Sequence, residues 1–163
     1  MLATYQRLLA AIDRVFEIAI IIIMSMMIAI VSAQVFTRYI FNSSFDWADE
    51  VARLCFVWTI FLAIPLALRQ GGHIVMELLV TRVSDQLRDR MYRSMSALSI
   101  VMMAFIAREA WKLTVDNWDE TIPSIGLSGG LFFLVVAVGC GHTVLHLMNI
   151  VVVGEPRRAG IIE

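Results

Sequence analysis

Residues 18–37 read IAIIIIMSMMIAIVSAQVFT, and none of these 20 positions carries a charged side chain. At about 1.5 Å per residue, a helix of this length spans roughly 30 Å, the thickness of the hydrocarbon layer of a bilayer. Arg7 and Arg14 precede the run, and small residues occupy part of 31–33, as in a secretory signal. The apolar core of such a signal is only about 7–15 residues long, so we expect a retained membrane helix over residues 15–37.

The remainder of the chain has the same character. Of its 163 residues, 60% are hydrophobic and 17% are charged, whereas soluble globular proteins are about 45–50% apolar. Three more uncharged segments follow, at 54–68, 95–107 and 121–154. The sequence therefore predicts an all-α integral membrane protein with about four transmembrane helices. The net charge of -1 gives no reason to expect nucleic acid as a partner.

The second apolar segment is short for a membrane span unless its helix begins earlier. Ser43 and Asp46 match the Ser-x-x-Asp/Glu capping signature, and Asp49 precedes Arg53 by four residues, a spacing that supports a helix. We therefore expect this helix to begin near Asp46.

The last apolar segment is too long for a single span. Proline and glycine, which disfavour helix interiors, interrupt its start at Pro123, Gly126, Gly129 and Gly130. We expect an irregular or partly inserted stretch at 121–130 and a helix over 131–153.

An amphipathic helix is expected between the second and third spans. Leu79, Val83, Leu87 and Met91 recur every four residues, while charged residues occupy the other faces. This pattern favours a helix lying in the membrane interface. A soluble helical hairpin packed on its own bundle is the alternative.

Arginine and lysine predict the orientation, because cytoplasmic loops carry an excess of both. If the N-terminus is cytoplasmic, nine of these residues lie inside: Arg7, Arg14, Arg69, Arg82, Arg88, Arg90, Arg93, Arg157 and Arg158. Four then lie outside: Arg38, Arg53, Arg108 and Lys112. We predict that both ends are cytoplasmic, with 1–14 and 154–163 as tails of a membrane domain at 15–153.

Histidines are the first candidates for chemistry. His142 and His146 lie four apart, on one face of the last helix. Together with His73 they raise the hypothesis of a membrane redox subunit that carries b-type haem. Haem bound by two histidines in a bundle takes them from facing helices, so we interpret the pair as polar residues in a helix–helix interface. Cys55 and Cys140 lie in apolar stretches and are interpreted as small hydrophobic residues.

A small autonomous exporter is a second alternative, because such proteins also have about four spans. They need a carboxylate within the membrane to couple protons. Here Asp13 and Glu17 stand at the start of the first span, near Arg14, and no span has a carboxylate or a permanently charged residue at its centre. Since an intramembrane charge is by default a functional site, this pattern argues against a transport site within the chain.

The most distinctive stretch is 35–53, VFTRYIFNSSFDWADEVAR, in which aromatic and charged residues alternate at an expected membrane boundary. Tyr39, Trp47 and Trp58 suit an interfacial aromatic belt. We expect ion pairs between the charged residues on either side of the turn, with Arg38 approaching Glu50 and Arg53 paired with Asp49.

Three motifs, in the expected order, make the chain resemble the small membrane subunit, DctQ type, of tripartite ATP-independent periplasmic (TRAP) transporters. The first and most specific is Arg38-Tyr39-Ile40-Phe41-Asn42-Ser43-Ser44 with Trp47-Ala48-Asp49-Glu50, Ala52-Arg53 and Phe56-Val57-Trp58. The others are Arg69-Gln70-Gly71-Gly72-His73-Ile74 with Glu77, and Glu120-Thr121 with Pro123 and Gly126. The resemblance covers about residues 15–153. Four departures, at Asp49, Pro65, Glu77 and Ser128, remove no charge and no span.

The resemblance implies a function for the chain. In this family a periplasmic solute-binding protein captures an organic acid, such as a dicarboxylate, sialic acid or another carboxylate. A large permease subunit then moves the acid inward, driven by sodium. The small subunit is a non-catalytic scaffold in the bacterial inner membrane, so the partners implied are the large permease, the binding protein and lipids.

The same resemblance implies no cofactor or metal in this chain, since sodium coupling belongs to the large subunit. It also indicates which residues contact the large subunit or lipid headgroups. These candidate interface residues are Arg38, Tyr39, Asn42, Trp47, Asp49, Glu50, Arg53, Trp58 and His73.

Overall fold

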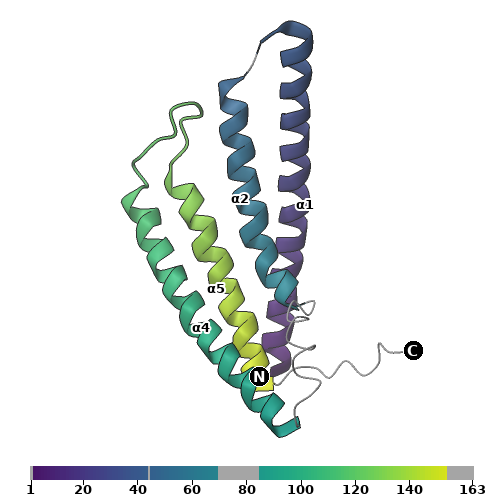
Figure 1. The fold of residues 1–163 in the computed structure, drawn as a ribbon, viewed down its shortest axis with the longest axis vertical. Coiled ribbons are helices and arrows are strands. Elements are labelled where there is room, and N and C mark those ends of the chain that lie inside the picture. Colours follow the sequence, from purple (N-terminus) through teal and green to yellow (C-terminus); the bar gives the residue numbers. More distant parts are fainter. Residues whose placement is uncertain (1, 44, 70–84, 154–163) are drawn as a thin grey trace, which may run out of the picture.

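The computed structural model describes residues 2–43, 45–69 and 85–153. This part forms four helices, α1 (Leu2–Phe41), α2 (Asp46–Arg69), α4 (Asp85–Asp116) and α5 (Gly130–Val153). The helices run alternately up and down, so the start of α1 and the end of α5 lie at the same end of the bundle (Figure 1). α5 packs between α4 and α2, and α1 packs against α2.

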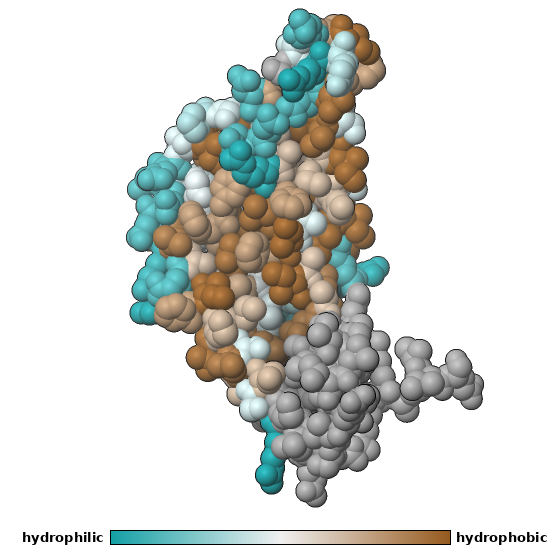
Figure 2. Space-filling model, viewed as in Figure 1, coloured by the Kyte–Doolittle hydropathy of each residue, from teal (hydrophilic) through white to brown (hydrophobic). Residues whose placement is uncertain are grey.

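The prediction of an all-α membrane protein is confirmed. Three helices of the described part are long and apolar enough to cross a membrane, over Tyr5–Phe41, Asp46–Leu68 and Gly130–Asn149. Hydrophobic residues cover the middle of the bundle, and hydrophilic residues gather at its upper end and along the outer edge of α4 (Figure 2). The 32 residues of α4 would extend about 48 Å, which is also enough to cross, so a fourth span stays a prediction.

The first helix is longer than predicted. α1 has 40 residues, about 60 Å at 1.5 Å per residue, so it extends beyond a hydrocarbon layer of about 30 Å. Residues 2–14 are mostly good helix formers, with no glycine or proline, and they continue the helix instead of forming a separate tail. At the other end Asn42 adopts a φ of 48°, a left-handed conformation that asparagine tolerates better than most residues and that ends helices.

The second helix begins at Asp46, as predicted, and continues through a buried proline, Pro65. Proline has no N–H, so the carbonyl of Phe61, four residues earlier, loses its helical donor. α5 passes directly over this carbonyl: a Cβ placed on Gly139 would overlap the Phe61 carbonyl group. Glycine in α5 therefore allows the close approach of two helices, which is how small residues commonly act in membranes.

The amphipathic helix expected at 79–91 is not a separate element where the structure describes it. Residues from Asp85 onward belong to α4, which continues without a break to Asp116. No glycine or proline lies between 85 and 116, so nothing in that part of the sequence ends the helix. The remainder of the expected element lies outside the described residues.

The irregular stretch expected at 121–130 is confirmed. The loop closes through hydrogen bonds from the Ile122 amide to the Leu127 carbonyl and from the Gly126 amide to the Ile122 carbonyl, both 2.8 Å. Gly126 has a φ of 66°, a conformation that glycine adopts at no steric cost. α5 then begins at Gly130, one residue before the predicted position.

This alternating arrangement yields a topology prediction. The arginine asymmetry places the end of the bundle that contains the start of α4 in the cytoplasm. A reporter fused after Gln86 or after Glu163 should be active only if it works in the cytoplasm, and one near Asn117 only if it works in the periplasm. Periplasmic activity at Gln86 would contradict the orientation.

Candidate functional site

The distinctive motif of the sequence forms the end of the α1–α2 hairpin. Gln34 on α1 donates a hydrogen bond from Nε2 to Oδ1 of Asp49 on α2, at 3.0 Å. Glu50 and Arg53 form an ion pair at 3.5 Å within α2. The predicted pairing of Arg53 with Asp49 is therefore wrong. Arg53 pairs instead with Glu50, three residues earlier, because residues three apart are also neighbours on a helix. The carboxylate of Asp49 accepts its hydrogen bond from Gln34.

The side chains at the end of α1 are exposed on the surface of the bundle. Arg38, Tyr39 and Asn42, together with Val35, line an open hollow of about 600 Å³. Tyr39 is 85% exposed. No ion pair joins Arg38 to Glu50 among the described residues, so that expected pair is not formed within this chain. An exposed arginine and tyrosine at a helix end suit contact with a protein partner or with lipid headgroups.

The remaining predicted interface residues differ in their surroundings. Trp47 is exposed and lies near Phe45, with ring centroids 5.8 Å apart. Trp58 is half-buried, and its indole Nε1 donates to the carbonyl of Leu131 at 3.2 Å, which joins α2 to the start of α5. His73 lies outside the described residues. The assignment of the set to an interface stays a prediction.

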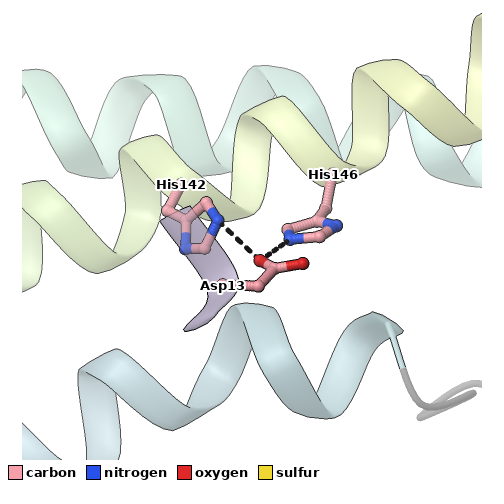
Figure 3. Close-up of side chains that lie close together, drawn as sticks. All are labelled: Asp13, His142 and His146. Atoms are coloured by element: carbon pink, nitrogen blue, oxygen red, sulfur yellow. Dashed lines mark hydrogen bonds and ion pairs between the residues drawn. The ribbon is translucent and has the colours of Figure 1, made fainter. Parts of the chain in front are cut away.

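A second site, which the sequence did not indicate as a unit, lies at the opposite end of the bundle. Oδ1 of Asp13 on α1 is 2.8 Å from Nε2 of His146 and 3.0 Å from Nε2 of His142, both on α5 (Figure 3). Asp13 is only 2% exposed, and both histidines are buried. Asp13 stands at the start of the first span, where the sequence placed it, but the structure buries this carboxylate between helices. The interpretation of the two histidines as residues of a helix–helix interface is confirmed.

The two histidines are not equivalent. His146 is in hydrogen-bonding geometry with Asp13. His142 lies close to the same oxygen, yet neither of its ring nitrogens has a hydrogen-bond partner. Phe16 of α1 packs edge-on against the His142 ring, with centroids 4.3 Å apart. His142 is thus buried against an aromatic ring while its Nε2 faces a carboxylate.

Polar groups surround this cluster on the side of the helix termini. Tyr5 donates from its hydroxyl to the Leu145 carbonyl at 2.8 Å, a second contact between α1 and α5. A hollow of about 210 Å³ lies beside the cluster and is lined by Gln6, Leu9, Ala10, Asp13, His146 and Asn149. The side-chain oxygen of Asn149 is buried without a hydrogen-bond partner.

The sequence spacing predicted that the two histidines lie together, but it did not link Asp13 to them. The four-residue interval between His142 and His146 placed both on one face of a helix. Asp13, more than a hundred positions away, stands before the uncharged run and next to Arg14, and so had the pattern of an ordinary charge at a helix end. The two cysteines, Cys55 and Cys140, are buried and free, in agreement with their interpretation as small hydrophobic residues.

Comparison with known proteins places most of the chain in one family. A sequence model of the family described as tripartite ATP-independent periplasmic transporters, DctQ component, matches residues 27–155. A putative TRAP transporter small permease protein of Haemophilus influenzae is 24% identical over 136 residues, covering 83% of this chain and 82% of that protein.

The names of two relatives state the solute that they transport. The sialic acid TRAP transporter small permease protein SiaQ of Vibrio cholerae is 27% identical over 96 residues, covering 59% of this chain and 50% of that protein. The sialic acid TRAP transporter permease protein SiaT of Haemophilus influenzae is 32% identical over 59 residues, which is 36% of this chain and 10% of SiaT.

Proposed function

Because the chain belongs to the DctQ component family of tripartite ATP-independent periplasmic transporters, we propose that it is the non-catalytic small permease subunit and acts as a scaffold for the large one. It spans the bacterial inner membrane several times, with both ends in the cytoplasm. Transport itself, coupled to sodium, takes place in the large permease, and a periplasmic solute-binding protein delivers the solute.

The observation that carries the scaffold role is the packing of α1. No residue in its most apolar 18-residue stretch is buried inside the chain. Large apolar side chains are exposed all along the helix, among them Ile18, Ile21, Ile22, Met24, Ile28, Val31, Val35 and Phe36. A surface of this kind must be covered by lipid or by another protein. Because α1 contributes so little to the core of this chain, it suits a subunit whose main contacts are with a partner.

The end of the α1–α2 hairpin supplies polar groups next to this surface. Arg38 and Tyr39 project outward on α1, and Asp49, Glu50 and Arg53 follow on α2. Charged groups at the edge of an apolar interface fix the register of two proteins and suppress wrong partners. We therefore place the contact with the large permease on α1 and on the hairpin end, with lipid headgroups around it.

The solute proposed is an organic acid. Two relatives are named for sialic acid, one a small and one a large permease protein. Both names support a carboxylate solute and a large permease partner, although the chain covers only part of either relative. Dicarboxylates and other carboxylates belong to the same proposed class, because the choice of acid rests with the other two components.

Copurification and uptake test the scaffold proposal together. Coexpressed with a large TRAP permease from the same organism, the chain should copurify in a fixed ratio that survives gel filtration. Cells that lack the chain should lose sodium-dependent uptake of the acid and regain it when the gene is restored. Expressed alone, the chain should aggregate in detergent, because the apolar face of α1 is then no longer covered by the large permease.

Two results would contradict the proposal. Transport by the purified chain alone in liposomes would indicate an autonomous exporter. A Soret band in the spectrum of the purified chain would indicate a haem-carrying redox subunit. A colourless preparation that transports only with the large subunit is the result expected.

A further inference from the structure

We propose that Asp13, His142 and His146 form a binding site for a divalent transition-metal ion such as Zn²⁺, which fastens the first helix of the bundle to the last. One ligand atom from each residue lies within 4.8 Å of the other two, and all three residues are buried. Two imidazoles and one carboxylate make a ligand set that suits zinc and its neighbours in the transition series, not calcium or magnesium.

The spacing of the ligands fits such an ion. His142 and His146 lie one helical turn apart, so their rings project from the same face of α5. Zinc binds imidazole nitrogen and carboxylate oxygen at about 2.0–2.2 Å, which puts the ligand atoms of a tetrahedral site about 3.3 Å apart. Two separations, from Asp13 Oδ1 to His146 at 2.8 Å and to His142 at 3.0 Å, would need to open by about 0.5 Å or less. The two histidine ligand atoms, which lie within 4.8 Å of each other, would need to close toward the same spacing.

The state of His142 points to a ligand. Its Nε2 is buried 3.0 Å from Asp13 Oδ1, within ion-pair distance, and its Nδ1 is buried with no hydrogen-bond partner. A buried ring nitrogen without a well-formed hydrogen bond is destabilising. A metal ion between His142 and Asp13 would use the lone pair of Nε2 and would place a positive charge beside the buried carboxylate.

The surroundings leave room for a fourth ligand. The hollow of about 210 Å³ reaches Asp13 and His146 and is also lined by Gln6 and Asn149. The Asn149 side-chain oxygen is buried and has no hydrogen-bond partner. It would supply a further acceptor for a water molecule bound to the ion, and Phe16 packs edge-on against the His142 ring.

The consequence for the fold is a fixed crossing of α1 and α5. α1 packs mainly on α2, whereas α5 packs on α2 and α4. The Asp13 cluster and the Tyr5 hydroxyl bond are direct polar contacts between α1 and α5. A bound ion would make this contact independent of lipid and would hold α1 in place while its apolar face receives the partner.

Metal titration of the full-length chain tests the site, with the chain purified from membranes in detergent together with any subunit that copurifies. After treatment with a chelator, the protein should bind one Zn²⁺ or Co²⁺ per chain, and bound Co²⁺ should show the strong visible absorption of a tetrahedral site. At a hundredfold excess over Kd, zinc should raise the melting temperature by about 5–10 °C.

Matched variants locate the ion. Asp13→Asn and His146→Gln, which keep the size and polarity of each side chain, should weaken zinc binding about a hundredfold or more. His73→Gln changes the only other histidine and should leave binding unchanged. Elution volume and helix content report whether each variant folds, and the Co²⁺ spectrum of the unmodified chain supports the site independently of them.

Two outcomes would overturn the proposal. One is a folded chain that binds neither ion at micromolar concentration and whose melting temperature neither ion changes. The other is binding that survives Asp13→Asn and His146→Gln but is lost in His73→Gln.

Discussion

Replacement of Gly139 by alanine is expected to disrupt the bundle, with a loss of about 1–3 kcal/mol in the free energy of unfolding, toward the upper end of that range. The added methyl group would occupy the position of the Phe61 carbonyl. A flexible side chain rotates away from such a clash, but a backbone carbonyl moves only with its helix. α2 and α5 must therefore separate, and their other contacts weaken with them.

Gly141 provides a matched control two residues along the same helix. A Cβ at Gly141 meets no atom within 4 Å, so Gly141→Ala should be neutral or slightly stabilising, because alanine favours a helix over glycine by about 1 kcal/mol. Unfolding of both variants in mixed micelles, followed by helix content, measures the difference. Equal stability of the two variants would mean that α5 does not approach the Phe61 carbonyl as closely as described.

Replacement of Glu50 by alanine is expected to weaken assembly with the large permease far more than it weakens the chain itself. Within the chain Glu50 pairs with Arg53, whose side chain is 65% exposed, and exposed pairs of this kind contribute only about 0–1 kcal/mol. If the hairpin end is covered by the large subunit, Glu50→Ala leaves Arg53 without its counter-ion in a desolvated interface. Such a loss costs about 3–5 kcal/mol.

Copurification yield and uptake rate in cells are the measurements for Glu50→Ala. Glu109→Ala is the control, because Glu109 forms the same kind of ion pair with Lys112, at 2.9 Å, on α4. The control should assemble and transport normally. Adding Arg53→Ala to Glu50→Ala should cost less than the sum of the two single changes, since the stranded charge is removed as well. Normal assembly of Glu50→Ala would reduce the motif to an interfacial anchor.

Much of the fold could be predicted because membrane helices are specified locally. Within the bilayer the backbone must satisfy its own hydrogen bonds, so an uncharged run of sufficient length is a helix whatever surrounds it. The start of α2 at Asp46 and the break before Gly130 followed from residues within a few positions of each boundary. The first helix was underestimated because hydropathy marks the part in lipid and not the helical turns that precede it.

The candidate interface was predictable as a set of residues but not as a set of contacts. The charges on the two sides of the turn were evident from 35–53, yet the expected pair between Asp49 and Arg53 gave way to others. Gln34, a neutral residue of the apolar run, reaches Asp49 across the hairpin. Which of several neighbouring groups form a pair depends on the rotation of α1 against α2, and sequence spacing within one helix contains no information on that rotation.

By itself, the sequence determined where the apolar helices lie, their alternating order and the family to which the chain belongs, because each of these is encoded in short stretches of residues. Only the tertiary structure decided which of those residues meet. The freed carbonyl at Phe61 and the glycine that covers it are 78 positions apart (139 − 61), and Asp13 is 133 positions from His146. Contacts between residues this far apart depend on how whole helices pack. Whether a carboxylate such as that of Asp13 is buried is decided by the neighbouring helix that covers it, and the local sequence does not contain that information.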